Sequence, residues 1–305
     1  MSLKIMACGL LCLLQDGGRR GWQHLGVSPG GPVDKHAAAW ANRLLDNGPG
    51  VPLLEIALGG VELEVQADTW LALAGAELPA MLDGKPLPGW SRFRVRAGQR
   101  LKLGFARTGQ RAYLAAAGGF SAQPILGSVA TQMREKLGGL AGNGQPLAAD
   151  DLLECAAYGE RFTRGASVPW PYRPDYREAP TLRVLPGPDP FSEDQRQAFF
   201  EQRWQVSPQS DRMGVRLRGE ALNAPRRQWS LGVVEGAIQV PPDGQPIVLL
   251  ADRQSMGGYP LLGVLHPLDI GRLAQCPAHS EVRFTPVSVE RAQADLRTFL
   301  RFFCG

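Results

Sequence analysis

Short runs of alternating apolar and polar residues recur along the whole chain and are separated by glycine and proline. The clearest runs are 61–65, 70–74, 93–96, 100–103, 111–114, 182–185, 215–218, 247–250 and 281–284. Alternation with a period of two places apolar side chains on one face of a strand and polar ones on the other. Because the 37 glycines and 25 prolines are spread through 305 residues, they predict many turns. The pattern predicts a mainly β fold of antiparallel strands closed into barrels or stacked as sandwiches.

Helices are expected to be few and short. Asp34 is placed to cap a helix over 35–45, and the Ser192 capping box opens a second helix through about Arg203. Ser288 precedes a third apolar-periodic stretch over 289–303, and a short fourth helix is expected after Pro267. We therefore expect these helices to plug or cover the strands.

The length predicts about two domains, because domains average about 150 residues. Residues 161–180 are rich in proline and aromatic residues and follow neither period. We place the boundary there, between a β-rich domain over 1–160 with one helix after its first loop and a barrel domain over 181–305. The segment 161–180 is either a strap packed on a barrel or a free linker.

Composition excludes several classes of protein. No stretch approaches the roughly 18 apolar residues of a membrane span, and the apolar start over 3–14 is cut short by Gln15 and Asp16, which favours a buried strand over a secretion signal. The net charge of +4 comes without a basic and aromatic window, so no nucleic acid partner is expected. Five scattered cysteines without a C-x-x-C pair fit the cytoplasm, and four isolated histidines predict no metal site.

Three windows carry more glycine and polar side chains than folding requires. The first, 15–34, is a glycine-rich loop before the predicted helix, and glycine lets backbone approach a ligand closely. Its polar members are Asp16, Arg19, Gln23, His24, Ser28 and Asp34. The alternative is a surface loop in which Asp34 only caps the helix.

The second window, 125–144, has neither a G-x-x-x-x-G-K-[ST] loop nor a G-x-G-x-x-G set, which argues against a conventional nucleotide-binding loop. Ser128, Thr131 and Arg134 are candidates to bind an anion there. A glycine-rich connection without a ligand is the alternative.

The third window, 236–260, packs many polar side chains around two predicted strands: Gln239, Asp243, Gln245, Asp252, Arg253, Gln254, Ser255 and Tyr259. Arg212 adds a charge in the turn 210–214 upstream. Buried polar groups are costly without partners, so these residues either bond one another or face a cleft.

These windows resemble the family of the 5-oxoprolinase C subunit, also described as the biotin-dependent carboxyltransferase or allophanate hydrolase subunit 2 family, which includes the antagonist of a sporulation-kinase inhibitor. The resemblance covers nearly the whole chain. Its other stretches are Leu54-Glu-Ile-Ala-Leu-Gly-Gly60, Ala115-Ala-Ala-Gly-Gly119, Leu126-Gly-Ser128, Leu185-Pro-Gly-Pro188 and Ser210-Asp-Arg-Met-Gly214.

The chain also departs from the family pattern. Val129, Ala130 and Gln132 stand where the family pattern carries Arg, Ser and Asp, so the loop lacks a cation and a carboxylate. Leu231 replaces a more usual acidic residue, and Ser255-Met256 replaces a more usual Thr pair. These departures leave the true substrate open and allow for a diverged or inactive member.

The resemblance implies cyclophilin-like β-barrel domains with a few short covering helices. It also implies a complex in which three subunits, A, B and C, hydrolyse the lactam of 5-oxo-L-proline to L-glutamate with ATP, the B subunit being the direct contact. ATP is expected to bind elsewhere in the complex. Phosphate transfer to the lactam oxygen would activate the carbonyl carbon for attack by water, which calls for oxyanion donors and a base.

Roles follow from this reading of the family. Arg253 and Gln239 would hold a carboxylate or oxyanion, Asp243 or Asp16 would act as the base, and His24 would shuttle a proton. Further substrate contacts are expected from Gln245, Tyr259, Ser128, Arg134 and Arg212.

Two other functions remain open. One is the carboxyltransferase module of a biotin-dependent urea or amide carboxylase, in which biotin would arrive on another polypeptide because this chain has no Met-Lys dipeptide. The other is a non-catalytic regulator that binds a protein similar to the B subunit.

Overall fold

The computed structural model describes residues 2–156 and 162–304, so Arg161, the expected start of the strap, lies outside the described residues. The chain divides into two compact units. Among the described residues, unit 1 comprises 2–20, 30–156, 162–175 and Cys304, and unit 2 comprises Gly21–Pro29 and Tyr176–Phe303. The segment Gly21–Pro29 thus groups with unit 2, although the chain on both sides of it belongs to unit 1.

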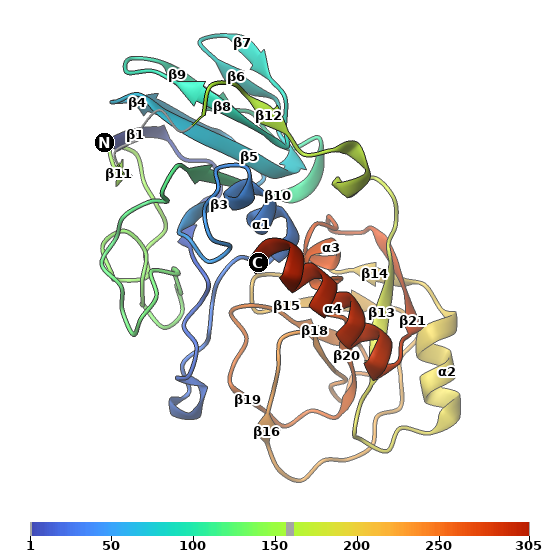
Figure 1. The fold of residues 1–305 in the computed structure, drawn as a ribbon. Helices are drawn as coiled ribbons and strands as arrows, with labels where there is room; N and C mark the ends of the chain where they lie inside the picture. Colours follow the sequence, from blue (N-terminus) through green and yellow to red (C-terminus); the bar gives the residue numbers. More distant parts are fainter. Residues whose placement is uncertain (1, 157–161, 305) are drawn as a thin grey trace. The chain divides into compact units, whose positions relative to one another are not determined.

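Unit 1 contains two six-stranded sheets (Figure 1). The first has the order β11 (Leu152–Glu154), β1 (Ser2–Ala7), β4 (Val61–Val65), β9 (Arg100–Leu103), β6 (Ala80–Leu82), β7 (Lys85–Leu87). The second has the order β12 (Ala166–Ser167), β8 (Ser91–Val95), β5 (Thr69–Glu77), β10 (Thr108–Ala116), β3 (Leu53–Ala57), β2 (Leu11–Gln15). The alternating runs predicted as strands in this half of the chain all lie in these sheets.

Alternation explains how the two sheets pack. In β4, Leu63 is buried, whereas Glu62 and Glu64 lie on the outer face opposite Lys102 and Arg100 of β9. The inward residues of both sheets form one hydrophobic cluster. Unit 1 is therefore a sandwich of two facing sheets.

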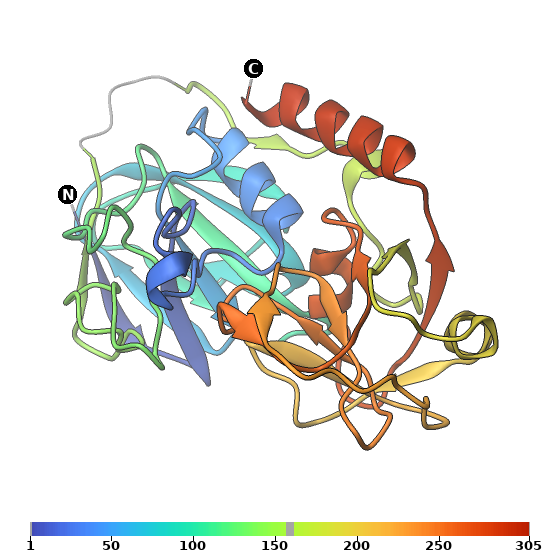
Figure 2. The same ribbon diagram turned by 90° about the horizontal axis from the view of Figure 1, so that it is seen from below.

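Strands β5 and β10 are buried on both faces because a helix covers their second face. Helix α1 (Lys35–Arg43) packs against both strands (Figure 2). Its alanines, including Ala37 and Ala41, allow close approach to the sheet. The carboxylate of Asp34 accepts a hydrogen bond from the Ala37 N–H at 3.1 Å, which confirms the predicted cap.

The described part of the segment 161–180 packs on unit 1 through residues 162–175. Strand β12 pairs with β8, the Val168 N–H donates to the Trp90 carbonyl oxygen, and Tyr172 of the 3-10 helix η2 (Trp170–Tyr172) packs against Trp40. These contacts favour a strap over a free linker. Trp170 is nevertheless 76% exposed, beside the Arg173 guanidinium.

Unit 2 is built on a closed seven-stranded barrel. Its order is β13 (Thr181–Pro186), β20 (Leu261–Leu265), β17 (Ala237–Gln239), β18 (Ile247–Leu249), β15 (Gly214–Arg218), β14 (Trp204–Val206), β21 (Glu281–Pro286). Neighbouring strands are antiparallel except for β13 and β21, which are parallel. Outside the barrel, β16 (Leu231–Gly232) and β19 (Met256–Gly257) form a separate two-stranded ribbon.

Unit 2 also contains one 3-10 helix and three α-helices among its described residues. They are η1 (Gln23–Leu25), α2 (Glu193–Glu201), α3 (Ile270–Ala274) and α4 (Val289–Cys304). Phe199 of α2 stacks on Phe284 of β21 at 4.7 Å and accepts a hydrogen bond from the Trp204 indole through its carbonyl oxygen. The predicted mainly β fold with few helices is confirmed. Within the described chain, none of the helices has the length and apolar character needed to cross a membrane.

A partly buried charge network joins α3 and α4 to the barrel. Arg183 of β13 makes a bidentate pair with Asp269 at 2.6 and 2.9 Å and donates to Asp295 of α4 at 2.6 Å. His266 lies fully buried 3.7 Å from Asp295, and its Nδ1 accepts from the Leu268 N–H. Burial first, and then the Arg183 charge, lower the pKa of His266, despite opposing contributions from both aspartates.

The lowered pKa of His266 predicts a loss of stability in acid. The unfolded chain, with a histidine pKa near 6.5, takes up the proton more readily, so stability should fall as the pH drops below about 6.5 towards the lowered value. His266→Asn keeps an acceptor for Leu268 without titrating. The free energy of unfolding in urea, measured between about pH 7.5 and about pH 5.5, should fall less for His266→Asn than for the natural chain; equal losses would contradict the prediction.

Candidate functional site

In unit 1, Asp16 organises the loop that contains Ser128. One carboxylate oxygen of Asp16 accepts from the Gly18 N–H at 2.9 Å and from the Ser128 hydroxyl at 2.5 Å. The other accepts from the Val129 N–H at 2.8 Å. The first and second sequence windows therefore meet here, where Asp16 and Ser128 are hydrogen-bonded to each other.

Arg19 is fully buried and binds the backbone of the same loop. Its guanidinium donates to the carbonyl oxygens of Ile125, Ser128 and Ala130 at 2.9, 3.2 and 2.7 Å. Such charge-assisted hydrogen bonds are among the stronger ones in proteins. Arg19 thus fixes an irregular glycine-rich backbone that has few side chains of its own to pack.

The remainder of the loop is also tied to the sheet. The Thr131 hydroxyl donates to the Leu14 carbonyl oxygen, and Gln15 donates to the Thr131 carbonyl oxygen. Gln132 is buried, and its Oε1 accepts from the N–H of Arg134, whose side chain is exposed. Val129 and Ala130, the departures from the family pattern, are buried in the loop.

A buried polar cluster behind this loop was not identified from the sequence. The Tyr113 hydroxyl donates to Glu55 at 2.8 Å, and the same Glu55 oxygen accepts from the Val33 N–H. Burial, followed by the Glu55 charge, raises the pKa of Tyr113 well above its ordinary value. The sequence feature that could have indicated this cluster is Glu55 within an otherwise apolar strand, because a buried carboxylate needs hydrogen-bond partners.

In unit 2, Arg253 follows β18 and is 5% exposed. Its guanidinium makes long hydrogen bonds to the carbonyl oxygens of Val233 at 3.3 Å and Leu250 at 3.4 Å. Burial lowers its pKa, with a smaller opposing contribution from Glu235. An incompletely neutralised buried cation with long hydrogen bonds is a candidate to bind an anionic group.

Ser28 joins the first window to the third. Its hydroxyl donates to the Arg253 carbonyl oxygen at 2.7 Å, across 225 residues of sequence. This contact lies within unit 2, because Gly21–Pro29 groups with that unit. His24 of η1 is on the same segment and is exposed.

Arg212 supports the turn before Arg253. It forms a buried bidentate pair with Asp252, both distances being 2.9 Å, and its carbonyl oxygen accepts from the Asp252 N–H. This pairing favours a supporting role for Arg212 over the direct substrate contact expected from the sequence.

The remaining expected residues of the third window lie in different places. Gln239 ends β17 and is buried, whereas Asp243 is exposed in the turn after it and accepts from the Gln245 N–H. The Gln245 amide both accepts from and donates to the Gly219 backbone. Tyr259 is 46% exposed. Because β17 and β18 are antiparallel, their connecting turn at Asp243 and the residue Arg253 lie at opposite ends of β18.

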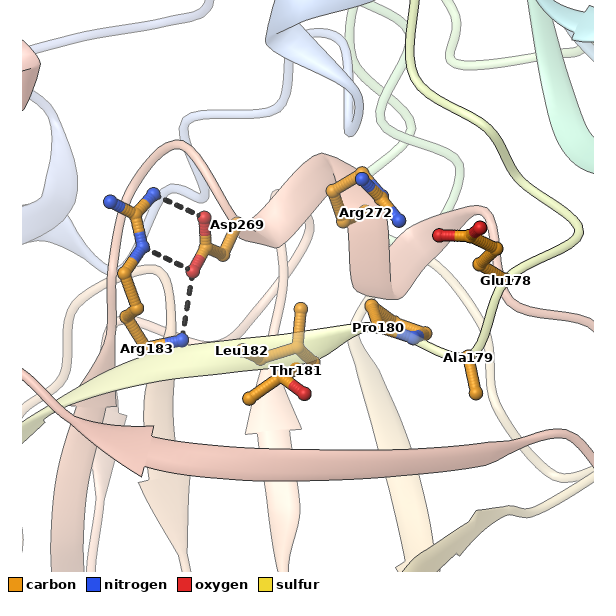
Figure 3. Close-up of a pocket in the computed structure, with 8 residues that line it drawn as sticks. All are labelled: Glu178, Ala179, Pro180, Thr181, Leu182, Arg183, Asp269 and Arg272. Atoms are coloured by element: carbon orange, nitrogen blue, oxygen red, sulfur yellow. Dashed lines mark hydrogen bonds and ion pairs between the residues drawn. The ribbon is translucent and has the colours of Figure 1, made fainter.

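A cavity of about 410 Å³ in unit 2 contains none of these residues. Figure 3 shows Arg183 bound to Asp269 at one end, with Glu178 and Arg272 toward the other. Charged side chains of both signs line this cavity, and Arg183 is already paired with Asp269. We therefore do not assign the reaction to this cavity. Among the described residues, no group of three or more His, Cys, Asp or Glu side chains is arranged to hold a metal ion.

Comparison with known proteins identifies the family. Residues 25–286 match the carboxyltransferase domain, subdomains A and B. The chain belongs to this family. It is 38% identical to the C subunit of 5-oxoprolinase from Escherichia coli, over 99% of this chain and 96% of that protein. The resemblance found in the sequence is therefore confirmed.

Solved structures of family relatives have the same fold. TTHA0988 superposes with a TM-score of 0.85 at 36% identity, over 93% of this chain and 55% of that chain. The urea carboxylase of Kluyveromyces lactis superposes with a TM-score of 0.89 at 25% identity, over 99% of this chain and 29% of that chain. This carboxyltransferase-family chain thus spans about half of the first solved chain and less than a third of the second.

The support by Arg19 predicts a large effect of its removal. Arg19→Leu removes three hydrogen bonds and leaves the Ala130 carbonyl oxygen without its donor, whereas the Ile125 and Ser128 carbonyl oxygens keep each other's N–H. A buried unpaired group costs about 1–3 kcal/mol, so we expect unit 1 to lose at least about that much stability. The neighbouring exposed Arg20 supplies a matched control, since Arg20→Leu should change stability by less than about 0.5 kcal/mol. Urea unfolding measures both changes, and hydrogen exchange should increase at residues 125–130 in Arg19→Leu alone. Similar stabilities of the two variants would refute this role.

Proposed function

We propose that this chain is the C subunit of a multi-subunit, ATP-dependent 5-oxoprolinase, which hydrolyses 5-oxo-L-proline to L-glutamate. The 38% identity to the Escherichia coli C subunit, over nearly the whole of both chains, carries this proposal. The chain would act as part of a hydrolase for a cyclic amide and would need the A and B subunits as partners, with the B subunit as its direct contact.

The reaction needs activation because an unstrained lactam is a poor electrophile. Transfer of the terminal phosphoryl group of ATP to the lactam oxygen releases ADP and makes the ring carbon reactive. One water molecule then adds to this carbon and the ring C–N bond breaks, with a proton going to the nitrogen. A second water molecule releases phosphate, so the proteins must place donors near oxygen and provide a proton carrier.

Arg253 and Gln239 are the donors best placed for this role in unit 2. Arg253 brings a buried positive charge, and Gln239 brings a buried amide. We assign the substrate carboxylate to Arg253, because guanidinium and carboxylate match in charge and in planar geometry. Gln239 then donates to the amide oxygen of the substrate.

His24 is the proton carrier that best fits the contacts. Asp16 already accepts three hydrogen bonds, and Asp243 lies in an exposed turn, where its carboxylate accepts from the Gln245 N–H. His24 belongs to the Gly21–Pro29 segment, which Ser28 ties to Arg253. An imidazole can accept a proton at one ring nitrogen and donate one from the other.

ATP is assigned to the complex rather than to this chain. The sequence contains no G-x-x-x-x-G-K-[ST] loop, and the glycine-rich loop 125–144 turns several of its carbonyl oxygens toward Arg19. Backbone N–H groups, not carbonyl oxygens, cradle phosphate. We therefore derive no phosphate-binding step from residues of this chain.

A carboxyltransferase acting with carboxylated biotin is the second candidate. The match to the carboxyltransferase domain and the similarity to Kluyveromyces lactis urea carboxylase favour it. In that case the biotin would be carried by another polypeptide, and the purified complex would react with streptavidin on a blot.

Reconstitution tests the main proposal. ADP and glutamate should be released from 5-oxo-L-proline by the chain together with the A and B subunits, and omission of any one should abolish turnover. In the full mixture Arg253→Ala should lower kcat/KM by about 100-fold, or about 2.7 kcal/mol, because an anion contact is lost. Arg216→Ala, at an exposed arginine of the same barrel, is the matched control and should have little effect.

Three other results of the reconstitution would change the proposal. Equal turnover with Arg253→Ala would remove Arg253 from the site. A stable complex with the B subunit but no turnover would replace the proposal with a regulatory role, and a biotinylated partner with carboxyl transfer would replace it with the second candidate.

A further inference from the structure

The side chain of Gln239 is buried without a partner for its donor group. It is 2% exposed, and its Nε2 makes no hydrogen bond with any residue that the structure describes. Buried amide donors are almost always paired in folded proteins, because an unpaired donor loses its hydrogen bonds to water. The Gln239 amide is therefore an available donor in need of an acceptor.

Gly257 of β19 lies directly against this amide. A Cβ atom placed on Gly257 would be 2.3 Å from Gln239 Nε2 and 3.1 Å from Val233 Cγ1. A side chain at this position would thus occupy the place of the amide. The absence of a side chain at residue 257 is what allows the amide to lie there.

The ribbon formed by β16 and β19 has an inner and an outer face. Leu231 pairs directly with Gly257, and Val233 lies 3.1 Å from a Cβ atom placed on Gly257, so both share the inner face with Gly257. Gly258 is on the outer face, where a Cβ atom would lie 3.3 Å from the Ser230 hydroxyl. The inner face that meets Gln239 is therefore mostly apolar.

Arg253 is attached to the same ribbon. Its Nε donates to the carbonyl oxygen of Val233, the residue that also neighbours Gly257. An amide donor, a cation and apolar side chains consequently share one neighbourhood. They match a small ligand that carries an amide oxygen, a carboxylate and ring methylene groups.

We propose that the β16–β19 ribbon is the cover of a binding site for a small cyclic amide with a carboxylate, and that Gly257 is the residue that positions the Gln239 amide on the ligand's carbonyl oxygen. Leu231 and Tyr259, which are 42% and 46% exposed, form the apolar wall against the ring. This inference rests on the proposed function and deepens it by assigning the ribbon and Gly257 to substrate selection.

Among the described strands, the ribbon is paired only within itself. Its strands are joined by two residue pairs and by the hydrogen bond from the Val233 N–H to the Ser255 carbonyl oxygen, and they are separate from the barrel ladder. Movement of the ribbon away from Gln239 would therefore break no barrel pairing.

Two adjacent glycines give a matched pair of variants. Neither Gly257 nor Gly258 has a positive φ, so alanine suits the backbone at both positions. Gly257→Ala should push the flexible end of Gln239 aside, whereas Gly258→Ala meets only the rotatable Ser230 hydroxyl on the outer face.

Binding is measured on the full chain by the side-chain NH₂ signals of Gln239 in ¹H–¹⁵N NMR spectra, assigned by their loss in Gln239→Met. The probes are 5-oxo-L-proline, pyrrolidin-2-one, which lacks the carboxylate, and cyclopentanecarboxylate, which lacks the amide. We expect the signals to shift with 5-oxo-L-proline, more weakly with pyrrolidin-2-one, and not with cyclopentanecarboxylate. Gly257→Ala should raise the Kd at least about tenfold, and Gly258→Ala by less than about twofold.

The inference is overturned if 5-oxo-L-proline leaves the Gln239 signals unchanged both in the chain alone and in the complex with the A and B subunits. Equal effects of the two glycine variants also overturn it. Shifted signals without turnover in the reconstituted mixture would retain the binding site and reject the proposed function. An unchanged KM with Gly257→Ala in an active complex would retain the proposed function and reject the role of Gly257 in the binding site.

Discussion

Buried arginines that donate to backbone carbonyl oxygens hold the irregular parts of this protein in place. Glycine-rich segments have few side chains to pack, so their order must come from hydrogen bonds. In unit 1, Arg19 supplies three such bonds to residues 125–130, and Asp16 supplies acceptors to the same loop. The barrel and the sandwich are stabilised by apolar burial, but the loops that distinguish the chain depend on these charged anchors.

The anchors also explain why one departure from the family pattern leaves the loop intact. Asp16 binds residue 129 through its main-chain N–H, so Val129 can occupy this position without loss of the contact. Arg19 likewise reaches the carbonyl oxygen of Ala130, which any residue provides. The replacements at these positions therefore leave the contacts of Asp16 and Arg19 with the loop in place.

In unit 2 the polar side chains divide into supporting and available groups. Arg212 and Asp252 satisfy each other, and Gln245 satisfies the Gly219 backbone. Arg253 has long hydrogen bonds, and Gln239 retains an unpaired donor. Because polar groups that only stabilise a fold are normally satisfied within it, the second pair is the one to which we assign the ligand in our proposal.

The sequence by itself determined the clearly alternating strands, the helix caps and the mainly β class, because alternation and capping act between residues a few positions apart. It also marked the three polar windows. It did not mark barrel strands such as β14 and β20. Only the tertiary structure decided how those windows combine, pairing Asp16 with Ser128 and Ser28 with Arg253 across 112 and 225 residues. It likewise showed that Asp243 is separated from Arg253 by the length of β18. Such pairings depend on which distant segments of the chain come together in the folded protein, and local periodicity carries no information about this.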